Sequence, residues 1–167
     1  LQFSYLRDHN IWQCTEEERC QKHDIVLKDL YDNLQSTVKH SREVLLALRE
    51  RGCRMVLVSN FYGNVETVLR EMQLDDLFVR VIESAAVGIR KPDPRIFLLG
   101  VEALGVPAGE VTIVGDNYEK DIFPGHEAGC HTVWLRGESW KDEAVDGKAA
   151  DVQILDIEEI LSPSFPF

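Results

Sequence analysis

Long hydrophobic runs are missing from this sequence of 167 residues. The longest apolar stretch runs from Ile96 to Val101 and has six residues if Gly100 is counted. A helix that spans a bilayer needs about 20 apolar residues, so we expect no transmembrane helix. No basic-then-apolar leader follows Leu1, so we expect no signal peptide, and the start at leucine suggests a piece of a longer chain.

Cysteine and positive charge are also scarce. The four cysteines, Cys14, Cys20, Cys53 and Cys130, form no CxxC pair, which favours a reduced, cytoplasmic setting. Cys14 and Cys20 with His23 match no standard zinc spacing and lack a fourth ligand. The 18 basic and 29 acidic residues give a net charge of −11, which disfavours nucleic acid or an anionic membrane as a partner. A small phosphorylated ligand stays compatible with this charge, because one cation and one lysine can reverse the local field.

Hydrophobic residues make up 44% of the sequence and charged residues 28%, which is typical of one globular domain. From residue 40 onward, short apolar runs alternate with amphipathic helical patterns. The runs predicted as strands are Arg54–Val58, Phe78–Ile82, Val111–Val114, His131–Leu135 and Asp151–Leu155. This alternation predicts an α/β fold with a Rossmann-like parallel sheet flanked by helices. Ligands of such sheets bind at the carboxyl ends of the strands.

The first part of the chain has a different pattern. Thr15 and Glu18 form a capping-box pattern that predicts a helix running to about Asn33. Ser41 is suited to cap a second helix, which Gly52 would end.

Three predicted strand ends carry polar residues of complementary chemistry. Ser59 and Asn60 follow the first strand and could cradle an oxyanion with nearby backbone N–H groups, although an ordinary turn explains them as well. Lys91 precedes Pro92, which favours an extended backbone and could aim the ammonium group at a phosphate. A surface lysine before a helix cap is the simpler alternative.

The third strand end carries two carboxylates. Asp116 lies where Val111–Val114 ends, and Asp121 lies in the first turns of the next helix. Two carboxylates near one point favour a hard divalent cation such as Mg²⁺. Helix capping is the alternative, and it explains one acid better than two.

Together, these segments resemble the haloacid dehalogenase-like hydrolase superfamily over about residues 40–137. VLVSN resembles its second motif, RKPDPRIF its third and IVGDNYEKD its fourth. The resemblance implies that Ser59 and Asn60 contact a phosphoryl group and that Lys91 stabilises it. It implies that Asp116 ligates Mg²⁺ and that Asp121 supports this metal. The GDxxxxD form of the fourth motif resembles the phosphatase branch.

One element of the family pattern is absent. No DxDx[TV] motif, which in the family supplies the nucleophilic aspartate on a central strand, occurs in the sequence. Residues 1–37 instead resemble the later part of a helical cap, followed by an incomplete core over residues 38–167. We therefore expect a fragment, inactive alone, whose sheet is completed by a missing N-terminal segment, a second chain or residues 1–6.

The sequence thus predicts that the parent protein is a magnesium-dependent phosphohydrolase of a small phosphorylated metabolite. The family implies an aspartyl-phosphate route. The alternatives are a non-catalytic regulatory or phosphate-binding domain, and a phosphotransferase or mutase of the same family.

Overall fold

The computed structural model describes residues 16–136 and 147–165. Thr15 of the capping-box pattern and residues 1–6, one predicted filler of the sheet, lie outside these ranges. The chain divides into two compact units, residues 1–40 and 41–167. Among the described helices, none has the length and apolar character that a membrane crossing requires.

The N-terminal helix is longer than expected. One helix, α2 (Glu16–Glu50), replaces the predicted pair of helices. Residues 34–41 contain neither glycine nor proline, so nothing in this stretch ends the helix, and Ser41 lies inside it. In the first unit, several large apolar side chains of α2 are exposed: Ile25, Val26, Leu27, Leu30, Tyr31 and Leu34. The assignment of residues 1–37 to part of a cap stays a prediction.

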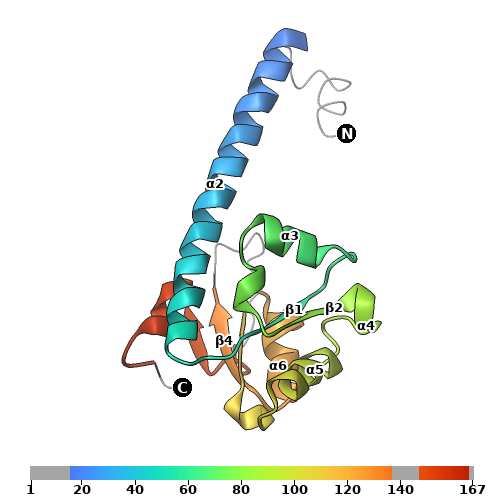
Figure 1. Cartoon of the computed structure of the whole chain (residues 1–167), viewed down its shortest axis with the longest axis vertical. Coiled ribbons are helices and arrows are strands. Elements are labelled where there is room, and N and C mark those ends of the chain that lie inside the picture. Colours follow the sequence, from blue (N-terminus) through green and yellow to red (C-terminus); the bar gives the residue numbers. More distant parts are fainter. Residues whose placement is uncertain (1–15, 137–146, 166–167) are drawn as a thin grey trace. The chain divides into compact units, whose positions relative to one another are not determined.

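Strands and helices alternate in the second unit, which confirms the predicted α/β class (Figure 1). The strands are β1 (Val56–Ser59), β2 (Arg80–Glu83), β3 (Thr112–Gly115), β4 (His131–Leu135) and β5 (Val152–Ile154). The α-helices after α2 are α3 (Val65–Glu71), α4 (Ser84–Val87), α5 (Arg95–Leu104) and α6 (Phe123–Glu127). Short helical turns complete the unit: η1 (Asp75–Leu77), η2 (Ala108–Glu110), η3 (Tyr118–Ile122) and η4 (Ile157–Leu161). The second strand begins at Arg80 rather than Phe78, because η1 and its cap occupy the residues before it.

The strands form two separately hydrogen-bonded groups. β1 pairs in parallel with β2, with Val58 opposite Ile82. The other group has the order β3-β4-β5 and is also parallel, with Val114 opposite Val133. Among the described strands, β1 and β3 are not hydrogen-bonded to each other, so each has a paired neighbour on one side only.

A common apolar core lies beneath both groups. Its buried centre consists of Ile82 from β2 with Ile96 and Phe97 from α5. Val58 of β1 and Ile113 of β3 pack against this centre. The core therefore joins the two strand groups through side chains, although their backbones are not paired.

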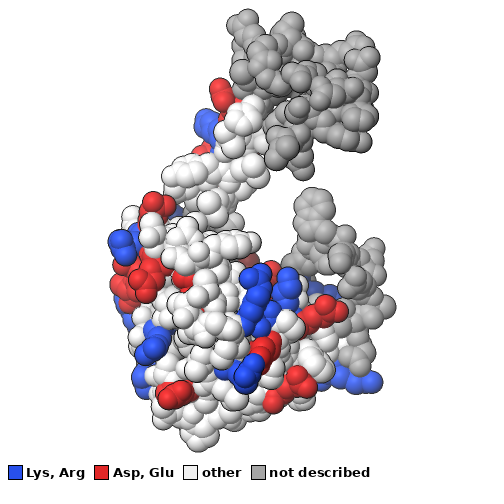
Figure 2. Space-filling model, turned by 90° about the vertical axis from the view of Figure 1, so that its right-hand side faces the viewer, with Lys and Arg blue, Asp and Glu red and all other residues white. Residues whose placement is uncertain are grey.

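The molecular surface carries charges of both signs. Figure 2 shows acidic and basic side chains mixed over the face that it draws, rather than a single continuous basic surface.

Candidate active site

The loop after β1 carries Ser59 and Asn60 and is held from the end of β2. The buried carboxylate of Glu83 accepts a hydrogen bond from the backbone N–H of Gly63. The hydroxyl of Ser84 donates to the carbonyl of Phe61 at 3.3 Å. Since these contacts fix the backbone that follows Ser59 and Asn60, the loop has a defined position relative to the sheet.

The side-chain amide of Asn60 both donates a hydrogen bond to the main chain of Lys91 and accepts one from it. Its Nδ2 donates to the carbonyl of Lys91 at 3.0 Å, and its Oδ1 accepts from the N–H of Lys91 at 2.9 Å. The peptide bond between Lys91 and Pro92 is cis. These contacts place the loop that leads to α5 beside the carboxyl end of β1.

The side chain of Lys91 forms a buried ion pair with Asp121. The ammonium nitrogen lies 2.5 Å from Oδ1 of Asp121, and the two side chains are only 15% and 8% exposed. The same nitrogen donates to the carbonyl of Val58 in β1 at 3.4 Å. Lys91 therefore connects the end of β1 with the element that follows β3. Such a buried pair needs further hydrogen bonds to offset its desolvation.

Asp121 lies on η3, a π-helical turn, where the sequence predicted an ordinary helix. Turns of this kind inside helices are frequent at functional sites. The second oxygen of Asp121, Oδ2, accepts from the backbone N–H of Asn117 at 3.2 Å. Both oxygens of this carboxylate thus have partners within the protein.

Gly115, at the end of β3, brings Asp121 against the strand. A Cβ atom added at Gly115 would overlap the Cβ and Cγ atoms of Asp121. Only glycine therefore allows the acid to lie directly against the strand end. Gly115 is not among the site residues predicted from the sequence, although its place directly before Asp116 was a usable signal.

Trp134 of β4 supports the same strand end. Its indole N–H donates to the carbonyl of Asp116 at 3.1 Å, and its ring lies 5.1 Å from that of Tyr118. The hydroxyl of Tyr118 in turn accepts from the N–H of Ala149 at 3.0 Å. No local pattern in the sequence indicates these contacts, because the partners come from separate elements.

The Asp116 carboxylate differs from that of Asp121. Asp116 is exposed, and within residues 16–136 and 147–165 its side chain has no hydrogen bond or ion pair. Carboxylate oxygens are the ligands that Mg²⁺ prefers. The donor set therefore fits this metal, with Asp116 available for coordination and Asp121 held beside it by Lys91 and Asn117.

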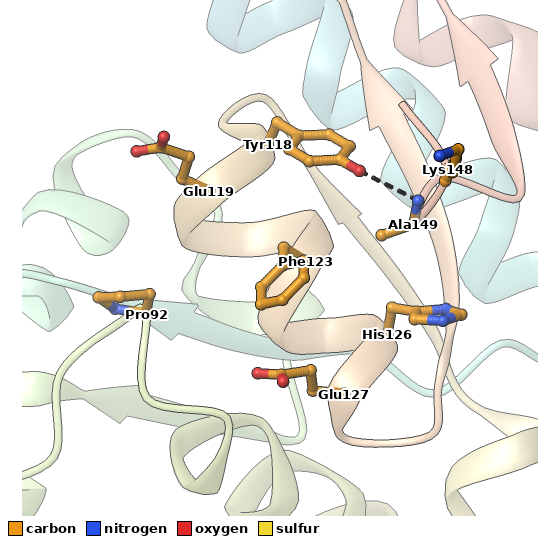
Figure 3. A pocket seen from close by; sticks show the side chains of 8 residues that line it. All are labelled: Pro92, Tyr118, Glu119, Phe123, His126, Glu127, Lys148 and Ala149. Atoms are coloured by element: carbon orange, nitrogen blue, oxygen red, sulfur yellow. Dashed lines mark hydrogen bonds between the residues drawn. The ribbon is translucent and has the colours of Figure 1, made fainter. Parts of the chain in front are cut away.

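A surface pocket near η3 is distinct from these residues (Figure 3). Its lining comes from η3, α6 and two loops: Pro92, Tyr118, Glu119, Phe123, His126, Glu127, Lys148 and Ala149. The lining contains none of Ser59, Lys91, Asp116 or Asp121. The candidate site is therefore defined by the chemistry of the strand ends and not by this pocket.

The predicted residues thus come together in the fold. Ser59 lies between Val58 and Asn60, which both contact Lys91. Asp116 lies between Gly115 and Asn117, which both adjoin Asp121. A lysine and two carboxylates therefore lie at the carboxyl ends of parallel strands, the place where α/β proteins bind their ligands.

Comparison with known proteins identifies the family. A family model described as haloacid dehalogenase-like hydrolase matches residues 9–129, and the chain belongs to this family. This confirms the resemblance drawn from the strand-end motifs.

Individual relatives are phosphatases by name. A glyceraldehyde 3-phosphate phosphatase of Pyrococcus abyssi is 38% identical over 103 residues, which cover 59% of this chain and 42% of the relative. A phosphoserine phosphatase of Thermus thermophilus is 35% identical over 118 residues, covering 70% and 46%. The crystal structure of a HAD phosphatase from Thermococcus onnurineus superposes with a TM-score of 0.65 at 29% identity, covering 72% of this chain and 54% of that one. The chain spans about half the length of these relatives.

Proposed function

We propose that this chain is part of a magnesium-dependent phosphohydrolase that acts on a small phosphorylated metabolite. The observation that carries the proposal is the buried pair of Lys91 and Asp121, which lies at the strand ends beside Ser59 and Asp116. The phosphatase names of the relatives support the reaction class.

Lys91 and Ser59 have the chemistry to stabilise a phosphoryl group in transfer. An ammonium group held in a partly dry site acts strongly on the charge that develops on phosphoryl oxygens. The Ser59 hydroxyl, at the end of β1, is suited to donate a hydrogen bond to one of these oxygens. In the proposal Lys91 and Ser59 are the catalytic residues, and both also contact the substrate.

Asp116 and Asp121 would hold the magnesium ion. Asp116 offers an exposed carboxylate, while the ion pair with Lys91 and the hydrogen bond from Asn117 keep Asp121 in a fixed orientation beside it. When bound, Mg²⁺ supplies positive charge that neutralises the phosphoryl oxygens.

The nucleophile is proposed to lie outside these 167 residues. The sequence contains no DxDx[TV] motif, and β1 and β3 each lack a hydrogen-bonded strand on one side within the described fold. Val114 of β3 is 42% exposed, whereas Val133 of the neighbouring β4 is fully buried. Because Val114 and Val133 are paired and lie on the same face of the sheet, this face is less covered at β3 than at β4, as we expect if β3 lies next to a part that is missing.

A cytoplasmic setting is also part of the proposal. It is supported by the free thiols of Cys53 and Cys130.

Hydrolysis of p-nitrophenyl phosphate in the presence of magnesium tests the proposal. We expect negligible activity from the 167-residue chain and clear activity from a protein extended upstream, because losing a covalent nucleophile costs several orders of magnitude. Comparable activity from both proteins would contradict the missing-nucleophile hypothesis. An inactive extended protein that still binds phosphate would instead favour a regulatory domain, and product analysis would reveal a phosphotransferase or mutase.

The metal role is tested in the extended protein by Asp116→Asn. Removing a ligand charge should weaken magnesium binding and abolish most turnover. Lys91→Ala should lower turnover with less effect on metal affinity. Asp75→Asn is a matched control, because Asp75 is exposed in η1 and has no contact with the site. An unchanged magnesium dependence in Asp116→Asn would show that Asp116 does not bind the metal.

A further inference from the structure

The amide group of Asn60 forms a closed pair of hydrogen bonds with the backbone of one residue. Nδ2 and Oδ1 contact the carbonyl and the N–H of Lys91 at 3.0 and 2.9 Å. Two hydrogen bonds that close a ring restrict both the position and the rotation of the backbone unit that they hold. Asn60 is half-buried, so these bonds are partly shielded from competition by water.

The other end of Lys91 is held as well. Its ammonium group contacts the carbonyl of Val58 and the carboxylate of Asp121 at 3.4 and 2.5 Å. A lysine side chain has four rotatable bonds, so its ammonium reaches one defined point only if its backbone is also held. Asn60 and Val58 belong to the same strand end, which therefore anchors Lys91 at its backbone and at its ammonium group.

We propose that Asn60 is a positioning residue that holds Lys91 in place, rather than a direct ligand of the phosphoryl group. The catalytic consequence rests on the proposed function, but the positioning itself does not. This changes the role that the sequence resemblance implied for Asn60. Its Nδ2 keeps a second N–H, so the experiment must separate positioning from direct binding.

The accessibility of Lys91 provides a direct measurement. The 167-residue chain is labelled with a trace of acetic anhydride, and each lysine is quantified by peptide mass spectrometry. Lys28, exposed on α2, provides the internal reference. In the wild-type chain, Lys91 should react more slowly than Lys28, because its side chain is only 15% exposed and its ammonium is paired.

Two variants remove the contacts of Asn60. Asn60→Ala truncates the side chain, and Asn60→Leu keeps nearly its shape without polar atoms, so either variant alone suffices if the other fails to fold. Both should raise the labelling rate of Lys91 severalfold and leave that of Lys28 unchanged. Asn64→Ala is the matched control, because Asn64 is exposed and its side chain forms no capping hydrogen bond with α3. Circular dichroism confirms that each variant is folded.

An unchanged rate at Lys91 in a folded Asn60 variant would overturn the proposal. In the extended protein, positioning predicts that Asn60→Ala lowers kcat more than it raises KM, because substrate contacts stay in place. A rise in KM alone would instead indicate a direct ligand and would also overturn it. If the extended wild-type protein lacks phosphatase activity, the proposed function fails, while the labelling result still decides the role of Asn60.

Discussion

Replacing Lys91 with methionine would leave the carboxylate of Asp121 without its cation. The side chains of this ion pair are 15% and 8% exposed, so water cannot readily solvate the acid that remains. Removing one partner of a buried pair typically costs about 3–5 kcal/mol. We expect the lower end, about 3 kcal/mol, because the N–H of Asn117 still donates to Asp121.

Urea unfolding of the 167-residue chain, followed by circular dichroism, measures this loss. An exposed ion pair of similar length supplies the control: Arg95 and Asp93 are 2.6 Å apart, and the Arg95 side chain is 71% exposed. Arg95→Met should therefore lower the free energy of unfolding far less than Lys91→Met. The double variant Lys91→Met with Asp121→Asn should recover much of the loss, since no unpaired charge stays buried.

Either of two results would contradict a stabilising role of burial at Lys91. One is that Lys91→Met and Arg95→Met destabilise the chain equally, which would mean that burial does not govern the Lys91 pair. The other is that the loss of stability in the double variant equals the sum of the losses in Lys91→Met and Asp121→Asn. Such additivity would mean that the two side chains do not interact, because coupled partners should not behave independently.

Other positions allow equally direct tests. Gly115→Ala should destabilise the chain by about 1–3 kcal/mol in urea unfolding, because the added methyl group overlaps Asp121, and wild-type stability would contradict that packing. Thr132→Val should cost about 1–3 kcal/mol in the same assay, since it removes the fully buried hydroxyl that donates a hydrogen bond to the carbonyl of Ala149; a variant of wild-type stability would show that this hydrogen bond contributes little. Burial raises the pKa of the Cys130 thiol, so a thiol reagent followed by peptide mapping should modify exposed Cys53 first at neutral pH, and the reverse order would be inconsistent with this fold.

The local sequence determined the elements of the second unit and the chemistry at their ends. The runs MVLV and VTIV form strands because each is short, rich in apolar and β-branched residues, and bounded by a charged residue on one side and by serine or glycine on the other. Gly105, in a left-handed conformation, ends α5. The predicted site residues follow the carboxyl ends of β1 and β3, which belong to two strand groups, and Lys91 joins these ends through Val58 and Asp121.

The helix boundaries were less accessible to sequence reasoning. Ser41 has the chemistry of a cap, yet it lies inside α2, since a capping residue does not start a helix when the preceding turn is already helical. The π-helical form of η3 was also missed. Contacts with neighbouring elements determine the conformation of the chain between β3 and α6. The residue types in YEKDI do not by themselves indicate a π-helical turn.

The partners of each site residue depend on contacts between segments that are distant in the sequence. Asn60 binds the backbone of Lys91 across 31 positions of sequence, and Lys91 reaches Asp121 across 30. Sequence spacing carries no information about which of several polar groups at a common sheet edge will meet. That choice depends on strand order, on the path of the loop before α5, and on the space that Gly115 leaves beside β3.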